Sequence, residues 1–491
     1  MVRPLVGLCC LLAFLISIVS VTAEDAKIGE WKKLEDSGVV IEYQQESEEV
    51  AKQLLPELVK QVKDVPSPGS KEHLAQLDEF AKQKDKSLQF IASQLGLDKP
   101  GQNMIQTYDG MLNSLRKIVL VIPDAKHVRL WQKEKLKTIL TSGQKVPGFT
   151  YDAASDSVNL QMNFSVDDNT TTRKDEPLPI VISEDIPAME TVQKVLHDVN
   201  GVISGFTGFL YPANAIYHDV AVNGIAGDVG VRTAFARWFI EGIANNVSSK
   251  CLDEFPTKIA TPVPPVWEDP SKFQSLKSKV DLLSWRSEAW EVAMPNKVEG
   301  ELLAAHMAFA TSEIKGLVDR HDEDTIPEIL KEFAKSEKRD RDAIFAAIKK
   351  VTGEDIKPAL EKYGSSAQDS FKGLAIINFG VAATEKSGED KLSATDTAVI
   401  PLATDGTRGL AVHFNYETLN PPVDLRVEVS TADGKVLVEK SIELTKPADR
   451  LVWPPMFTED FKPGDHVVKL YFDKKLFKEV PVKLVTPEDK E

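Results

Sequence analysis

The hydrophobic pattern changes near residue 390, and this change limits the fold more than any other feature of the chain. Up to about Tyr363 the apolar residues recur mostly at helical spacing. From about Leu392 to Val485 they alternate with polar residues in short runs between turn residues, as in Val423–Val429 before the turn Asp433-Gly434. We therefore expect an α+β chain that ends in a small antiparallel, immunoglobulin-like β-sandwich over 391–491, after a linker at 371–390.

The body before the linker carries several strand-like runs among its helices. Helical spacing is found at about 46–62, 71–95, 125–141, 188–249 and 299–363. The strand-like runs are Val39–Tyr43, Lys117–Ile122, a hairpin pattern over Gly148–Phe164, and Leu178–Ser183. These patterns predict a small mixed sheet followed by helices. We divide the body into an N-terminal α/β segment with a helical insertion (24–116) and a second domain (117–370).

The N-terminus has the pattern of an export signal. Arg3 is the only charged residue before Glu24, and the residues between them form an apolar run that ends in small residues up to Ala23. We expect residues 1–23 to be a signal peptide cleaved near Ala23, which places the protein in the periplasm or outside the cell. The alternative is that the run stays as a membrane anchor, and no later stretch is long and apolar enough to span a bilayer.

Charge and cysteine content exclude two classes of protein. The formal net charge is −16, and such an acidic surface repels the phosphate backbone of nucleic acids, so we expect no nucleic-acid partner. Two of the three cysteines, Cys9 and Cys10, lie in the signal. The remaining Cys251 cannot form an internal disulfide, which excludes a disulfide-stabilised scaffold. We expect Cys251 to be a buried structural thiol rather than a nucleophile.

One short motif carries chemical content. Residues 238–244 read Trp-Phe-Ile-Glu-Gly-Ile-Ala, and at this point the chain, over about Trp31 to Tyr363, resembles the gluzincin metallopeptidases of the peptidase MA-like group. In that group a helix with His-Glu-x-x-His supplies two zinc ligands and a general base, and a later helix with Trp-x-x-Glu-Gly-x-Ala supplies a third ligand. The resemblance implies a zincin-like body and assigns the third-ligand position to Glu241.

The upstream motif departs from the family pattern at both of its candidate positions. His218-Asp219-Val220-Ala221-Val222 is separated from Glu241 by eighteen residues, a spacing typical of the aminopeptidase-like branch. The alternative first ligand is His197, followed by Asp198 and closer to the hairpin. Neither position has the second histidine. Asp219 at the general-base position is one methylene shorter than glutamate and reaches less far toward a metal-bound water.

A site with His218 and Glu241 falls short of the three protein ligands of a catalytic zinc. We therefore expect an exported, peptidase-like protein without catalysis or cofactor that acts in binding or as a scaffold. Its partner would be a protein, a peptide or an envelope component. The alternative is an active, atypical zinc peptidase that uses His197, His218 and Glu241. A third interpretation needs no ligand at all: the histidines and Trp238 pack in the core, and Glu241 pairs with Arg232 or Arg237.

Overall fold

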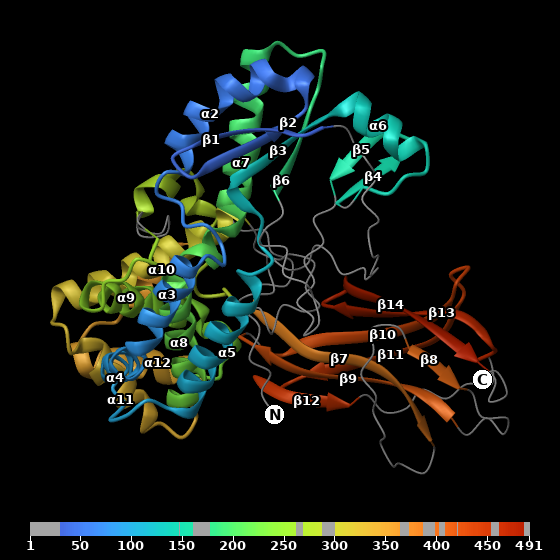
Figure 1. The fold of residues 1–491 in the computed structure, drawn as a ribbon. Helices are drawn as coiled ribbons and strands as arrows, with labels where there is room; N and C mark the ends of the chain where they lie inside the picture. The colour runs from blue at the N-terminus through green and yellow to red at the C-terminus, as the bar shows by residue number, and fades with distance from the viewer. Residues whose placement is uncertain are drawn as a thin grey trace. The chain divides into compact units, whose positions relative to one another are not determined.

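A computed structural model of the chain describes residues 30–146, 148–160, 177–261, 269–286, 300–363, 373–385, 398–401, 408–419, 421–452 and 461–485. Its helices and sheets make the protein an α+β protein, as predicted (Figure 1). Two compact units are present: residues 1–93, 98–224 and 247–264 form unit 1, and residues 94–97, 225–246 and 265–491 form unit 2. The predicted signal at 1–23 lies outside the described residues. In the described part of the chain, no helix combines the length and apolar character needed to cross a membrane.

Unit 1 contains a mixed four-stranded sheet in the order β1-β2-β3-β6. Strands β1 (Lys32–Asp36) and β2 (Val39–Tyr43) are antiparallel, whereas β2, β3 (Asp124–Gln132) and β6 (Pro177–Ile182) run parallel. Helices α2 (Glu48–Val62) and α7 (Ala188–Leu210) bury their apolar stripes on one face of this sheet. A small hairpin of β4 (Phe149–Asp152) and β5 (Ser157–Leu160) packs with α6 (Lys133–Thr141).

The other helices of unit 1 form a second layer. They are α3 (Lys71–Lys82), α4 (Lys84–Gln94), α5 (Gln102–Ile118) and α8 (Ala213–Asn223). Ser70 caps α3, since its hydroxyl accepts a hydrogen bond from the His73 amide at 3.1 Å. Phe80 stacks on Tyr108 and tilts against Tyr217, and these fully buried rings join α3, α5 and α8.

Unit 2 begins with short helical turns and continues with longer helices. The turns are η3 (Gly224–Val229), η4 (Ala234–Ala236) and η6 (Pro270–Lys279). The helices are α9 (Arg237–Glu254), α10 (Gly300–Arg320), α11 (Thr325–Ala334), α12 (Arg341–Thr352) and α13 (Lys357–Leu360). The residues of α9 from Val247 onward belong to unit 1. Asp340 caps α12 through the Ala343 amide at 2.9 Å, and Gly353 ends it in the left-handed conformation.

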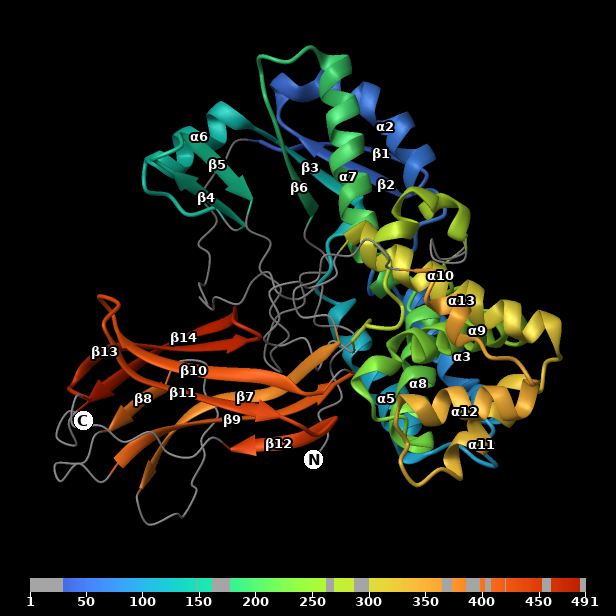
Figure 2. The same ribbon diagram turned by 180° about the vertical axis from the view of Figure 1, so that it is seen from behind.

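The C-terminal part of unit 2 is the predicted β-sandwich (Figure 2). One sheet has the order β11-β10-β13-β14-β8 and the other β12-β9-β7, and apolar side chains from both sheets share one core. The strands are β7 (Leu374–Glu385), β8 (Ala398–Pro401), β9 (Arg408–Thr418), β10 (Val423–Thr431), β11 (Val436–Leu444), β12 (Ala448–Val452), β13 (Gly464–Phe472) and β14 (Lys475–Val485). All pairs are antiparallel except β14 with β8.

The structure corrects two predicted domain boundaries. The boundary at 116/117 is wrong, because β1 and β2 from before it share one sheet with β3 and β6 from after it. The linker at 371–390 is also wrong over 374–385: this stretch is β7, and its Leu374, Ile376 and Val381 are buried in the sandwich core. The rest of that predicted linker lies outside the described residues.

Two predicted elements before the hairpin are wrong as well. Lys117–Ile122 is not a strand, since it contains the end of α5 and the turn that follows. The predicted helix at 125–141 is instead β3 followed by the short α6, and the apolar residues Val128 and Leu130 point into the sheet core. The predicted strands at 39–43 and 178–183 are confirmed as β2 and β6.

Candidate functional site

Glu241 lies on α9 inside unit 2, and its carboxylate is paired with a cation. The residue is 8% exposed. Arg237, one helical turn earlier, is also buried and donates from Nε to Oε1 of Glu241 at 3.4 Å. Side chains four residues apart lie on the same face of a helix, which brings these two together. The alternative in which Glu241 pairs with Arg237 is thus confirmed.

Arg237 makes two further contacts besides its ion pair with Glu241. Its guanidinium lies over the ring of Trp285, with 4.7 Å between the guanidinium carbon and the ring centroid. Its Nη1 donates to the backbone oxygen of Arg286 at 3.1 Å. A planar guanidinium with several fixed donors suits such a combined ion pair, stacking contact and hydrogen bond. Arg237 therefore connects Glu241, Trp285 and the backbone of Arg286 in the interior of unit 2.

His306 on α10 extends this buried cluster. Its ring lies 5.2 Å from the ring of Trp285, centroid to centroid. Nδ1 contacts the backbone oxygen of Leu302 at 2.8 Å, and the backbone N–H of Asp281 donates to Nε2 at 3.1 Å. A carbonyl only accepts, so Nδ1 carries the proton and the imidazole is neutral. Burial lowers the pKa of His306 to about 4, against the partial opposition of the Leu302 contact.

Gly242 has a packing role next to Glu241. A Cβ at this position would lie 2.6 Å from Cγ1 of Ile314 and 2.7 Å from the backbone oxygen of Ala310, both on α10. Only glycine permits this approach of α9 to α10. One turn later, Asn245 Nδ2 donates to Thr311 Oγ1 at 2.9 Å and ties the same two helices together. The Glu-Gly pair is thus explained by contacts within unit 2.

The predicted upstream residues lie on α8 in unit 1. His218 Nδ1 is 3.1 Å from Oδ1 of Asp219, and both side chains are partly buried. The backbone oxygen of Asp219 accepts a hydrogen bond from Asn223 Nδ2 at 2.8 Å. His218 and Asp219 therefore interact with each other. Val222, at the position of the second histidine, offers no ligand atom.

His197 lies on a different element, the exposed side of α7. Its neighbour Asp198 accepts a hydrogen bond from Lys194 at 2.7 Å, one turn earlier on the same helix. Val195 and Val199 on the same helix are buried against the sheet. His197 thus occupies the solvent-facing side of an amphipathic helix.

These residues do not fit a zinc ion. Within the described ranges, no group of three or more His, Cys, Asp or Glu side chains gathers in a way that could hold a metal. Zinc at Glu241 would also bring two positive charges next to the guanidinium of Arg237 in a buried setting, which is unfavourable.

Cys251 is the buried thiol that the sequence predicts. It is fully buried, and burial raises the pKa of its thiol. A cysteine nucleophile needs an accessible thiolate. Cys251 is not accessible and its thiol does not ionise readily, so it has a structural role in unit 1.

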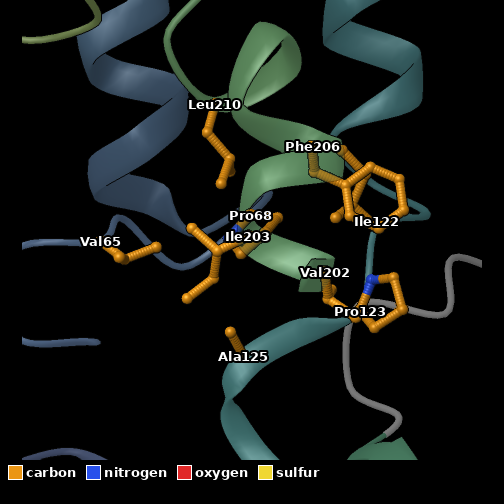
Figure 3. Close-up of a pocket in the computed structure, with 9 residues that line it drawn as sticks. All are labelled: Val65, Pro68, Ile122, Pro123, Ala125, Val202, Ile203, Phe206 and Leu210. Carbon is orange, nitrogen blue, oxygen red and sulfur yellow. The ribbon is translucent and has the colours of Figure 1, made fainter. Parts of the chain in front are cut away.

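Unit 1 also has a small apolar pocket beside the C-terminal half of α7 (Figure 3). It is open to solvent, and little of its space is enclosed. Its lining is entirely apolar and consists of Val65, Pro68, Ile122, Pro123, Ala125, Val202, Ile203, Phe206 and Leu210. None of the predicted site residues lines it, and it offers no group for acid–base or metal chemistry.

Comparison with known proteins assigns no family. A search with protein-family models finds no match to the chain, and no curated protein matches its sequence. An immunoglobulin-like protein from Pseudomonas aeruginosa is 14% identical, with 24% of this chain and 99% of that chain covered, at a TM-score of 0.16. The Pseudomonas fluorescens alkylpurine DNA glycosylase AlkC, bound to DNA with an abasic-site analogue, is 12% identical over 60% of this chain and 86% of that chain, at 0.13. Scores this low carry no conclusion on fold or function.

Proposed function

We propose that this is an exported protein that keeps the plan of a gluzincin peptidase but hydrolyses nothing, and that it serves as a binding or scaffold protein for a protein, a peptide or an envelope component. The observation that carries the proposal is the buried ion pair of Glu241 with Arg237. In the resemblance, Glu241 takes the place of a zinc ligand. In this chain the positive charge next to Glu241 comes from the guanidinium of Arg237.

The energetics of a buried pair support this interpretation. Removing one partner of a buried ion pair leaves the other charge uncompensated, which typically costs about 3–5 kcal/mol. A zinc ion that captured Glu241 would impose this cost on Arg237. Because Arg237 also stacks on Trp285 and donates to the Arg286 carbonyl, it is not free to turn away without losing those contacts.

The residues at the first-ligand position support it too. Asp219 is engaged with His218, and the position of the second histidine is Val222. A water activated for hydrolysis needs a metal and a general base within hydrogen-bond reach. Among the described residues, no group of three or more His, Cys, Asp or Glu side chains could hold that metal.

Metal analysis of the purified, exported chain tests the proposal. After incubation with zinc and dialysis, we expect far less than one zinc per chain by elemental mass spectrometry. We also expect no shift in melting temperature on chelation and no cleavage of a quenched-fluorescence peptide library. Near-stoichiometric zinc that is lost in Glu241→Gln, together with metal-dependent cleavage, would establish the active peptidase and overturn the proposal.

A double-mutant cycle separates the ion pair from a metal site. Glu241→Gln and Arg237→Met should each lower the free energy of unfolding by about 3 kcal/mol or more, and the double variant by less than their sum. The same values are expected with and without chelator, measured by urea unfolding. A destabilisation by Glu241→Gln that vanishes once zinc is stripped from both proteins would instead indicate a ligand.

A further inference from the structure

We propose that the C-terminal sandwich is a clamp on the first turn of α9, fastened at two points by Glu417 and Arg286, so that the sandwich positions the helix that carries Glu241. All groups involved belong to unit 2. The clamp does not depend on whether the protein hydrolyses peptides.

The first fastening point caps η4, the short turn that leads into α9. Glu417, near the end of β9, accepts hydrogen bonds from the hydroxyl of Thr233 through Oε1 and from the backbone N–H of Ala234 through Oε2, the latter at 2.7 Å. Thr233 precedes η4, which leads directly into α9. The first N–H groups of a helical turn have no partner within the turn, so a carboxylate that accepts from one of them satisfies a donor that is otherwise unpaired. A strand residue, more than 180 positions later in the chain, thus supplies the cap.

The second fastening point starts from the adjacent strand. Arg286, which is 5% exposed, donates from Nη1 to the backbone oxygen of Leu374 at 2.5 Å, and its own backbone oxygen accepts from Arg237. Leu374 is the first residue of β7 and pairs with Thr418 of β9. A chain of hydrogen bonds therefore leads from β7 through Arg286 and Arg237 to Glu241.

Both fastening points lie at the same end of the ladder formed by β7 and β9. In the register of β7 with β9, Leu374 pairs with Thr418 and Ala375 with Glu417. At this end of the ladder Ala234 and Phe235 of η4 also belong to one apolar cluster with Ala375 of β7. Two polar contacts and one apolar contact thus join the start of α9 to the same end of the ladder.

The polar contacts of Glu417 offset part of the cost of burying its carboxyl group. Burial raises the pKa of this group, and Asp340 raises it as well, whereas the hydrogen bonds from Thr233 and Ala234 and the nearby Arg341 lower it. The two hydrogen bonds therefore favour the ionised carboxylate, which is the form that accepts from both donors.

Hydrogen–deuterium exchange of the full chain tests the clamp. Glu417→Ala should speed amide exchange in residues 233–240 about tenfold, as expected for loss of a charged helix cap, while α12 exchanges as before. Arg286→Met should speed exchange in the same segment. The milder Glu417→Gln retains one acceptor and should give a smaller effect, and it serves if the alanine variant does not fold.

Glu428→Ala is the matched control. Glu428 lies in the same sandwich on β10, is also nearly buried, and pairs with Arg426 and Lys469 at 3.7 and 3.8 Å. Its loss should leave exchange in 233–240 unchanged. The clamp is overturned if Glu417→Ala and Arg286→Met leave this segment unchanged, or if they speed exchange in α12 and 233–240 alike, because both results mean that the contacts do not hold α9 specifically.

Discussion

The neutral state of His306 predicts a specific loss of stability in mild acid. The side chain is 2% exposed, and its two nitrogens are engaged by Leu302 and Asp281 in a way that only the neutral ring allows. Its pKa is about 4 in the folded protein against 6.5 for an ordinary histidine. Between these values the unfolded chain binds a proton that the folded protein does not, so stability falls as the pH falls.

The size of the effect follows from the two pKa values. One pKa unit corresponds to about 1.4 kcal/mol, so the whole window from pH 6.5 to 4 is worth about 3 kcal/mol for this residue. At pH 5 about 60% of that, or about 2 kcal/mol, should already be lost. This is a large share of the stability of an ordinary domain, about 5–15 kcal/mol.

Urea unfolding at several pH values, followed by tryptophan fluorescence, measures this contribution. His306→Gln keeps an acceptor for the Asp281 amide and does not titrate, so the difference between the wild type and this variant isolates the histidine. The wild type should lose its advantage over the variant as the pH falls from 6.5 to 4. Parallel loss of stability in both proteins over that range would refute the neutral, buried state of His306.

Three further outcomes follow from local contacts. Gly242→Ala should lower unfolding stability by about 1–3 kcal/mol through its clash with α10, whereas Gly205→Ala, with open space on α7, should raise it by about 0.5–1 kcal/mol, both by urea unfolding. Gly230→Ala should lower the melting temperature, since φ is +87° and a Cβ would lie 2.3 Å from the Arg339 guanidinium. Arg320 lowers the pKa of Glu354 to about 2, so their exposed pair should add at most about 1 kcal/mol above pH 4.5 and fade toward pH 2, a difference that Glu354→Gln abolishes.

The sequence predicts the sandwich better than the body, for a physical reason. In β10 the buried apolar residues Leu425, Val427 and Val429 alternate with polar ones, because only one face of that strand packs in the sandwich core. In β3 the rule fails. Val128 and Leu130 face the sheet core, while Trp131 on the other face is covered by the hairpin, so apolar residues occur on both faces and the period of two is hidden.

The strand predicted at 117–122, just before β3, is wrong for a related reason. The apolar run at 117–122 directly continues the helical spacing of Met104, Tyr108, Leu112 and Leu115 in α5. A short apolar run cannot be assigned to strand or helix by periodicity alone. Packing between elements that are far apart in the sequence, here of α5 against α8, decides such a segment, and that information is not local.

In the candidate site, too, local contacts could be predicted from the sequence and long-range contacts could not. The pairing of Arg237 with Glu241 could be predicted, because the i,i+4 spacing places both on one helical face. The contacts of Arg237 with Trp285 and of Trp285 with His306 join segments that are 20 to nearly 50 residues apart in the sequence. No spacing rule indicates such contacts, and only the folded chain of unit 2 brings these side chains together.

The motif at 238–244 can therefore arise from packing alone. Trp238 is fully buried and stacks on Phe345 of α12, Glu241 neutralises Arg237, and Gly242 permits the approach of α10. Each residue has a contact that would select it without any metal. A Trp-x-x-Glu-Gly-x-Ala pattern thus describes how a helix sits among its neighbours, and it becomes evidence for zinc only when the carboxylate is available and two further ligands converge on it. In this chain the carboxylate is paired with Arg237, so the motif by itself is no evidence for a zinc site.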